Sequence, residues 1–335
     1  MRKMASTTEF DKVADPFRQE LLSYCYRMLG SVDDAEDQVQ ETLLRAWRAY
    51  GDFEGRSSVR TWLYRIATNA CMRALETRPR RPLPSGLGAP AEDPLGSLPA
   101  AGTEIRWLQP IPDSLVLAGP ADPAAVVTAR ASLRLALIAA LQYLPPRQRA
   151  VLILRDVLGW HAAEVATLLD TSTAAANSVL QRAREQLAKV TPAEDDLREP
   201  ADPADRTLLD RYAAAFENAD VAALTELLRE DATFEMPPQP LWFSGREQIA
   251  AFLRSRVLTE AGRFLLVPTS ANGSTAFAAY ERTEDGSYVA HGVHVPATDG
   301  RWLTGIVAFN NARLVGTFGM PGELAADAGA AARRA

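Results

Sequence analysis

The chain has 335 residues, of which 47% are hydrophobic and 23% are charged; this balance is typical of two or three folded domains and excludes a disordered chain. No run of 18 apolar residues predicts a membrane span, and the first residues lack the apolar segment of a signal peptide, so we expect a cytoplasmic protein. The net charge of −6 excludes a protein that is basic throughout, although residues 124–190 hold 8 Lys/Arg against 4 Asp/Glu and residues 191–335 hold 13 against 21.

Residues 12–78 are predicted to form a bundle of helices. Ser31 precedes two aspartates and is a helix start signal. Cys25 and Cys71 have no motif spacing and lie in apolar stretches, so we expect small buried thiols. Apolar side chains recur at helical spacing in three stripes: Phe17, Leu21, Leu22 and Cys25; Val39, Leu43, Leu44 and Trp47; and Val59, Trp62, Leu63, Ile66 and Ala70.

Two linkers are predicted. Residues 79–123 are rich in Pro and Gly, which interrupt helix and strand alike, and residues 191–203 form a second, acidic linker. The first linker contains one apolar island, Trp107-Leu108-Gln109-Pro110. A tryptophan in a flexible linker exposes a large apolar area unless something covers it. Trp107, Leu108 and Pro110 are therefore candidate docking residues.

Residues 124–190 are predicted to be helical, with a break at Pro145-Pro146, and residues 162–181 have the pattern of a helix-turn-helix. At its turn, Asp170 tolerates the left-handed conformation, and Thr171 or Ser172 can cap the second helix. The residues expected to face inward are Ala163, Val165, Ala166 and Leu169 in the first helix and Ala176, Val179, Leu180 and Ala183 in the second.

The second of these helices leaves a polar face outside. Asn and Gln side chains pair with adenine edges and Arg pairs with guanine or phosphate, so this face is a candidate DNA-binding surface. A plain helical hairpin with a solvated face is the alternative, and the positive charge of the segment favours DNA. The residues on this face are Thr173, Ala174, Asn177, Ser178, Gln181 and Arg182.

Residues 204–322 are predicted to form an α+β domain with a curved antiparallel sheet, and residues 323–335 are predicted to be a disordered tail. Turns are expected at Asn272-Gly273, Asp285-Gly286 and Asp299-Gly300. Helical patterns cover residues 206–218, 220–229 and 246–257, and strand patterns cover residues 233–236, 263–270, 274–282, 287–296 and 301–318.

Several of these segments resemble known families. Residues 144–152 and the helix-turn-helix that follows them resemble region 4 of bacterial sigma factors, and residues 34–47 and 53–69 resemble region 2. Because other regions are lacking, the chain resembles the extracytoplasmic-function (ECF) class. The Trp107 island and the C-terminal third resemble a subgroup of that class with a SnoaL-like domain, on the basis of residues 212–217 and 234–238.

The resemblance implies a multidomain fold and a division of labour. Two all-α sigma domains, at residues 12–78 and 124–190, would be followed by a cone-shaped α+β domain at residues 204–322. In the family, region 2 binds the β′ clamp helices of the RNA polymerase core and melts and reads the −10 promoter element. Region 4 contacts the β flap and reads the −35 element. The resemblance implies an accessory factor with no catalytic residue of its own, no metal and no cofactor.

The region 2 resemblance and the residue types together give two candidate sites. Arg65, Asn69 and Arg73 are four apart and share one helix face, and residues 52–58 are small and polar, which suits an extruded base. A solvated charged face is the alternative for such a helix. The candidate core-binding residues are Asp37, Gln40, Glu41, Leu44, Trp47 and Arg48. The candidate −10 residues are Arg56, Arg60, Arg65, Asn69 and Arg73.

Two positions depart from the usual helix-turn-helix pattern. Asp170 stands where glycine is frequent, and Ala176 stands where a larger aliphatic residue is common. Both residues are compatible with the fold.

The C-terminal domain offers candidate pocket residues but no single function. His291 and His294 are three apart on a strand, so we expect them to point to opposite faces and to form no paired metal site. The domain is expected to regulate the sigma regions by docking, and a small-molecule sensor is the first alternative. An isomerase-type enzyme ranks below it; such a reaction needs a carboxylate base and an oxyanion donor, and the candidate groups are Asp231, Glu235, Tyr280, His291 and His294. The candidate pocket residues are Glu235, Trp242, Tyr280, His294 and Phe309.

A classical repressor or activator that binds its promoter without polymerase is an alternative for the whole chain. The region 2 resemblance argues against it.

Overall fold

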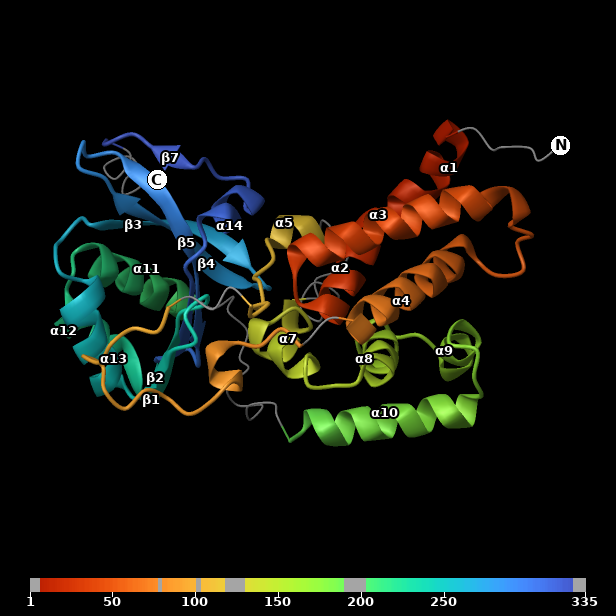
Figure 1. Cartoon of the computed structure of the whole chain (residues 1–335), viewed down its shortest axis with the longest axis horizontal. Coiled ribbons are helices and arrows are strands. Elements are labelled where there is room, and N and C mark those ends of the chain that lie inside the picture. The colour runs from red at the N-terminus through yellow and green to blue at the C-terminus, as the bar shows by residue number, and fades with distance from the viewer. Residues whose placement is uncertain (1–6, 78–79, 101–103, 118–129, 190–202, 328–335) are drawn as a thin grey trace. The chain divides into compact units, whose positions relative to one another are not determined.

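A computed structural model describes residues 7–77, 80–100, 104–117, 130–189 and 203–327 (Figure 1). The chain forms two compact units: the first contains Met1–Arg81 and Asp113–Thr191, and the second contains Pro82–Pro112 and Pro192–Ala335. The two helical regions thus share one unit, and residues 82–112 of the first linker belong to the other. None of the described helices has the length and apolar character that a membrane crossing requires.

The N-terminal helices of the first unit pack around a core of aromatic and thiol side chains. They are α1 (Thr7–Ala14), α2 (Arg18–Leu29), α3 (Val32–Ala49) and α4 (Val59–Thr77). Ser31 caps α3, since its side chain accepts a hydrogen bond from the backbone nitrogen of Asp34, as the start signal predicts. Cys25 and Cys71 are free and buried, which confirms the prediction for both thiols.

The second helical region follows α5 (Asp113–Val116) and contains α7 (Leu135–Leu141), α8 (Pro146–Leu152), a π-helical turn at Ile153–Val157, α9 (Ala162–Leu168) and α10 (Thr173–Leu187). Asp170 has φ of 51° and Ser172 caps α10 by accepting a hydrogen bond from Ala175, so the predicted turn is confirmed. The predicted inner face of α9 is partly wrong. Ala163 is exposed and Leu168 is buried, because the inward stripe continues to the last residue of α9.

Two buried arginines join the helical regions of the first unit. The guanidinium group of Arg27 on α2 donates hydrogen bonds to the backbone and side-chain oxygens of Ser132 (3.3 and 2.7 Å). Arg149 on α8 donates to the carbonyl oxygen of Met28 and to the side-chain oxygen of Gln142. Burial lowers the pKa of each arginine to about 10, so both remain charged at neutral pH. Oxygen acceptors around each guanidinium group offset much of its desolvation, although Nε of Arg149 has no hydrogen-bond partner among the described residues.

The second unit has an open, curved sheet with the strand order β2-β1-β6-β5-β4-β3, and β7 pairs with β5. All described pairings are antiparallel except that of β1 with β6, which is parallel. The sheet contributes to one apolar core with its helices. The strands are β1 (Leu228–Glu235), β2 (Trp242–Ser244), β3 (Phe264–Ala271), β4 (Ser274–Arg282), β5 (Tyr288–Thr298), β6 (Leu303–Phe309) and β7 (Glu323–Leu324), and the helices are α11 (Pro203–Glu217), α12 (Val221–Leu227), α13 (Arg246–Phe252) and α14 (Ala312–Thr317).

Two boundaries predicted for this unit are wrong. The strand pattern at residues 301–318 divides into β6 and α14, because the side chain of Asn311 caps the helix by accepting a hydrogen bond from Arg313. The tail does not begin at residue 323, since Glu323 and Leu324 pair with Val289 and Tyr288 of β5. Residues 328–335 of the predicted tail, and residues 191–202 of the acidic linker, lie outside the described residues.

A β-bulge in β5 is the main irregularity of the sheet. On β4, the neighbours Ala279 and Tyr280 pair with Gly292 and Ala290, so His291 is the extra residue. A Cβ atom at Gly292 would lie 2.0 Å from the carbonyl oxygen of Phe309 on β6. Only glycine allows β5 and β6 to come this close beside the bulge.

We therefore expect Gly292→Ala to destabilise the protein by about 1–3 kcal/mol, because the backbone of β6 has to move to admit the methyl group. Urea unfolding measures the loss. Gly316→Ala is the matched control, since a Cβ atom on this helical glycine of α14 meets nothing within 4 Å, and its free energy of unfolding should stay equal or rise. Equal unfolding midpoints for the wild type and Gly292→Ala would contradict the prediction.

Candidate functional site

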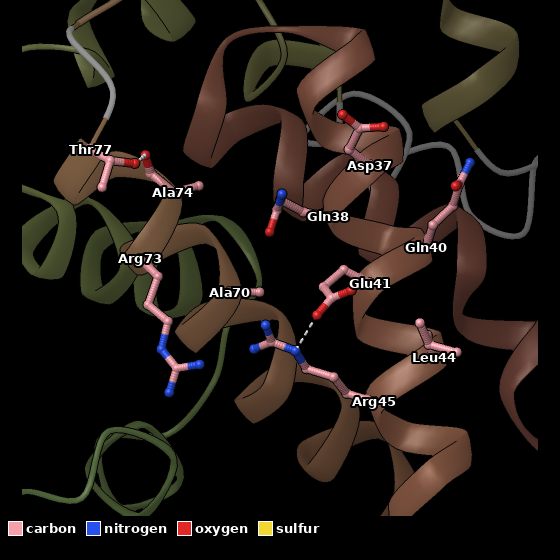
Figure 2. A pocket seen from close by; sticks show the side chains of 10 residues that line it. All are labelled: Asp37, Gln38, Gln40, Glu41, Leu44, Arg45, Ala70, Arg73, Ala74 and Thr77. Atoms are coloured by element: carbon pink, nitrogen blue, oxygen red, sulfur yellow. Dashed lines mark hydrogen bonds and ion pairs between the residues drawn. The ribbon is translucent and has the colours of Figure 1, made fainter.

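An open groove of about 550 Å³ lies between α3 and α4 in the first unit (Figure 2). The α3 side presents Asp37, Gln40, Glu41 and Leu44, four of the six residues predicted to bind the polymerase core. Leu44 is 40% exposed, which is unusual for a large apolar residue on a packed helix. The other two predicted residues, the half-buried Trp47 and the exposed Arg48, lie one turn further along the same helix.

The charges around the groove have both signs. Arg45 donates a hydrogen bond to Glu41 at 2.5 Å, one turn earlier on α3 (Figure 2). Asp37 lies at the same wall, and Arg73 contributes a guanidinium group from α4. The groove thus combines an exposed apolar side chain with a mixed polar surround, which is the composition of a protein interface. The participation of Arg45 is not among the sequence predictions, although its spacing from Glu41 signals the ion pair.

The row of polar residues on α4 is exposed, but one predicted −10 residue is engaged inside the unit. Arg65, Asn69 and Arg73 are all exposed on α4. Arg60 instead donates hydrogen bonds to Glu20 of α2, and its guanidinium carbon lies 5.1 Å from the ring centre of Trp160. Three of the predicted residues therefore share an accessible face, whereas Arg60 is held between the two helical regions.

The loop before α4 lies on an aromatic cluster. The ring of Phe53 packs against Trp62 at a centroid distance of 4.7 Å and stacks parallel to Tyr50 at 6.5 Å. Gly55 has φ of 69°, a conformation that side chains other than glycine rarely adopt. Arg56, the remaining predicted −10 residue, is exposed and pairs with Glu54 at 2.8 Å. The polar loop is thus anchored by the packing of Phe53 against Tyr50 and Trp62.

The predicted polar face of α10 is fully exposed. Its members Thr173, Ala174, Asn177, Ser178, Gln181 and Arg182 all lie outside, while Ala176, Leu180 and Ala183 are buried. Gln181 donates a hydrogen bond to Glu185 at 3.1 Å. Arg184, two residues after Arg182, forms an ion pair with Asp156 instead. The departures at Asp170 and Ala176 leave the recognition helix in the predicted position.

The first linker is held by hydrogen bonds within the second unit. The backbone nitrogen of Ser85 donates to the carboxylate of Glu235 at 2.8 Å, and Nε1 of Trp242 donates to the carbonyl oxygen of Gly88 at 2.9 Å. The backbone nitrogen of Ala91 donates to the carbonyl oxygen of Trp242 at 2.8 Å. Glu235 is buried, and this burial raises the pKa of its carboxyl group. Glu235 and Trp242, predicted as pocket residues, thus hold the linker.

The end of the linker is fixed by a reciprocal pair of hydrogen bonds. Ile111 donates from its backbone nitrogen to Oδ1 of Asn272 (3.1 Å), and the backbone nitrogen of Asn272 donates to the carbonyl oxygen of Ile111 (3.0 Å). Asn272 is buried and has φ of 55°. In the predicted docking island, Leu108 is fully buried, Pro110 is buried and Trp107 is half-buried. No sequence pattern indicates these partners, because they are about 160 residues apart.

The second unit also contains a cavity of about 170 Å³. Of the predicted pocket residues, only His294 lines it: Tyr280 donates its hydroxyl hydrogen to the carbonyl oxygen of Pro321, and Phe309 is buried outside the lining. The prediction that His291 and His294 face opposite sides of the sheet is wrong. Both line the cavity, because the bulge at His291 changes the alternation of β5.

The described lining of this cavity contains no Asp or Glu and thus offers no carboxylate base. His291 of the lining lies 3.5 Å from Glu281, which is outside it. Burial and the neighbouring His291 lower the pKa of His294 to about 3, so its imidazole is neutral, and Nδ1 lies 2.8 Å from the hydroxyl of Tyr212. Of the two candidate carboxylates, Asp231 pairs with Arg229 at the surface and Glu235 accepts from Ser85, and neither lines the cavity. Among the described residues, no group of three or more His, Cys, Asp or Glu is placed to hold a metal.

Three parts of the chain match protein families. Residues 14–81 match sigma-70 region 2, residues 134–187 match sigma-70 region 4 and residues 209–310 match the SnoaL-like domain. These matches define a sigma factor with an additional C-terminal domain.

Whole-chain comparisons agree. The chain is 49% identical over 318 residues to the ECF RNA polymerase sigma factor SigG of Mycobacterium tuberculosis, covering 94% of this chain and 85% of SigG. It is 32% identical over 221 residues to SigJ of the same organism, covering 66% of this chain and 62% of SigJ. The crystal structure of SigJ superposes with a TM-score of 0.58 at 27% identity, over 95% of this chain and all of that structure. The chain belongs to the ECF RNA polymerase sigma factors.

Proposed function

We propose that this sigma factor binds the polymerase core through α3, opens and reads promoter DNA with α4 and α10, and is regulated by its second unit through the first linker. One observation supports the binding of polymerase and DNA at different surfaces. The exposed residues form a groove with an apolar centre on α3 and separate polar faces on α4 and α10. A factor that positions another enzyme needs such surfaces and no catalytic group of its own, and we place its action in the cytoplasm.

The proposed contact with polymerase centres on Leu44. This half-exposed apolar residue has Asp37, Gln40 and Glu41 around it, and Trp47 one turn away. Burial of Leu44 against a partner gains hydrophobic free energy, while the polar residues fix the orientation. A rod-like partner such as the paired β′ clamp helices fits an open groove that follows a helix. We assign the contact of the second helical region to the β flap on the family resemblance.

The proposed DNA contacts are divided between two helices. On α4, the exposed Arg65, Asn69 and Arg73 line up for the −10 strand, and the loop at residues 52–58 is the proposed site for an extruded base. Arg60 joins them only when it leaves Trp160, which lies in the second helical region. On α10, Asn177, Gln181 and Arg182 are the base-reading candidates for the −35 element.

The proposed regulation rests on the docked linker. Residues 82–112 connect the two helical regions along the chain. Hydrogen bonds that Trp242 and Arg256 donate and that Glu235 and Asn272 accept hold them in the second unit. A docked linker has less freedom to extend, so docking limits the distance that the two DNA-reading regions can span. An isomerase-type activity is disfavoured, since the described cavity lining has no carboxylate to act as base.

The core contact is tested with Leu44→Ala and Trp47→Ala. We expect each to weaken binding to purified core polymerase about fivefold to thirtyfold, because a loss of roughly 1–2 kcal/mol is typical for an anchoring apolar residue. Equilibrium binding of fluorescently labelled sigma factor measures the change. Val289→Ala, at a residue of similar exposure (39%) in the second unit, should bind as the wild type does. Failure of the wild-type protein to bind the core would contradict the whole proposal.

The −35 contact is tested with a neighbouring pair of arginines on α10. We expect Arg182→Ala to weaken the binding of the polymerase holoenzyme to promoter DNA and to reduce the salt dependence of log K by about one unit, since one phosphate or base contact is lost. Arg184→Ala removes the same charge from a residue already paired with Asp156 and should have a smaller effect. Equal losses for the two variants would show that overall charge, and not the exposed face, determines binding.

The regulatory contact is tested at Asn272. Asn272→Gly removes the Oδ1 acceptor but keeps the left-handed backbone, whereas Asn272→Asp keeps both the acceptor and the conformational tolerance. We expect Asn272→Gly to speed hydrogen exchange at the amide of Ile111 by about fivefold or more and to raise run-off transcription, while Asn272→Asp stays close to the wild type. Faster exchange with unchanged transcription would contradict the regulatory role of the linker.

A further inference from the structure

The cavity of the second unit has an aromatic wall. Phe216, Phe234, Phe252 and Phe264 line it together with Met236. Its volume of about 170 Å³ slightly exceeds that of the apolar cavity of roughly 150 Å³ that binds benzene in an engineered protein. A single aromatic ring therefore fits, and flat rings pack favourably against phenylalanine faces and edges.

One polar group of the lining lacks a partner among the described residues. Oε1 of Gln239 is buried without a hydrogen bond, although Gln239 lies at the cavity in the turn between β1 and β2. An unsatisfied buried amide oxygen costs roughly 1–3 kcal/mol. A ligand hydroxyl is a suitable partner, because it both donates and accepts and so suits either orientation of the amide.

The charged groups of the lining are already engaged. Arg263 pairs with Glu281 at 2.7 Å, and His294 is neutral. Arg256 donates hydrogen bonds to the carbonyl oxygens of Leu95 (2.6 Å) and Gly96 (3.0 Å). These contacts leave the cavity suited to an uncharged ligand, since an anion would have to displace an existing partner from one of the arginines.

The linker forms part of the cavity wall. Leu98 of the linker lines the cavity although its side chain is 46% exposed, and Arg256 at the cavity holds the backbone two and three residues before it. Leu98 thus forms part of the wall, and the segment before it is fixed by hydrogen bonds from Arg256, another lining residue. The same segment lies in the linker between the two sigma regions.

We propose that this cavity binds a small uncharged aromatic alcohol of the phenol class, with its hydroxyl group on Gln239 and its ring among the phenylalanines, beneath linker residues 95–98. A bound ring adds apolar contact to Leu98 and stabilises the docked linker. The site extends the proposed function, because it gives linker docking a chemical input. Phenol binding is measured without polymerase, so a negative result would contradict the ligand site and leave the proposed role in transcription untouched.

The test measures the binding of phenol to the full-length chain by equilibrium dialysis, with toluene as a probe of the same shape that lacks the hydroxyl group. We expect saturable binding of one phenol per chain. In Gln239→Leu, the ratio of phenol to toluene affinity should fall about fivefold to tenfold, because the hydroxyl loses its partner. Gln248→Leu, at an exposed glutamine of α13, is the matched control and should keep the wild-type ratio.

A second variant and a second measurement test the role of linker residues 95–98. Leu98→Ala should weaken phenol and toluene by similar factors, since it removes apolar wall and leaves Gln239 in place. Phenol should slow hydrogen exchange at the amides of residues 95–98 in the wild-type protein. The proposal is overturned by any of three results: no saturable phenol binding, an unchanged affinity ratio in a folded Gln239→Leu, or tighter binding of benzoate than of phenol.

Discussion

The reciprocal hydrogen bonds between Asn272 and Ile111 are the constraint on which the docking of the first linker in the second unit depends. They fix the end of the first linker within this unit at a buried residue that adopts a left-handed backbone. Both ends of the described linker are then secured, since Ser85 is bonded to Glu235 near its start. A segment rich in Pro and Gly therefore becomes a defined part of the domain, although it has little regular structure of its own.

The helical regions have a corresponding constraint in Arg27 and Arg149. Arg27 donates to the backbone and side-chain oxygens of Ser132, and Arg149 donates to the carbonyl oxygen of Met28. Among the described residues, neither arginine is paired with a carboxylate. Carbonyl acceptors give directional contacts without the strong attraction of a full charge pair. Such an interface is specific and can still separate, which suits the proposed reading of different promoter elements by the two regions. Arg60 adds a further contact between the two helical regions, since it donates a hydrogen bond to Glu20 and lies over the ring of Trp160.

Sequence reasoning predicted the features that local physics determines. The turn at Asp170, the cap at Ser172 and the exposed face of α10 follow from residues within a few positions of one another, and all are found in the structure. The row Arg65, Asn69 and Arg73 follows from helical periodicity in the same way. These features need no knowledge of distant contacts.

The failures concern residues whose position depends on distant parts of the chain. Glu235 and Trp242 have the residue types of a pocket, yet their partners lie about 150 residues away in the linker. The alternation rule placed His291 and His294 on opposite faces, but the bulge beside Gly292 depends on how closely β5 approaches β6. The strand pattern at residues 301–318 stops at β6 because the side chain of Asn311 caps α14, and this local hydrogen bond competes with strand pairing. Tertiary contacts decide each of these cases.

The membership of residues 82–112 in the second unit has a consequence for modular engineering. This unit is discontinuous in sequence, since the whole second helical region lies between its two pieces. A chimera that exchanges only the segment after residue 203 would leave the native linker facing foreign partners in place of Glu235, Trp242 and Asn272. A chimera that keeps the folded unit intact must exchange both pieces together. The linker and the C-terminal domain therefore have to be transferred as one unit, although they are separate in sequence.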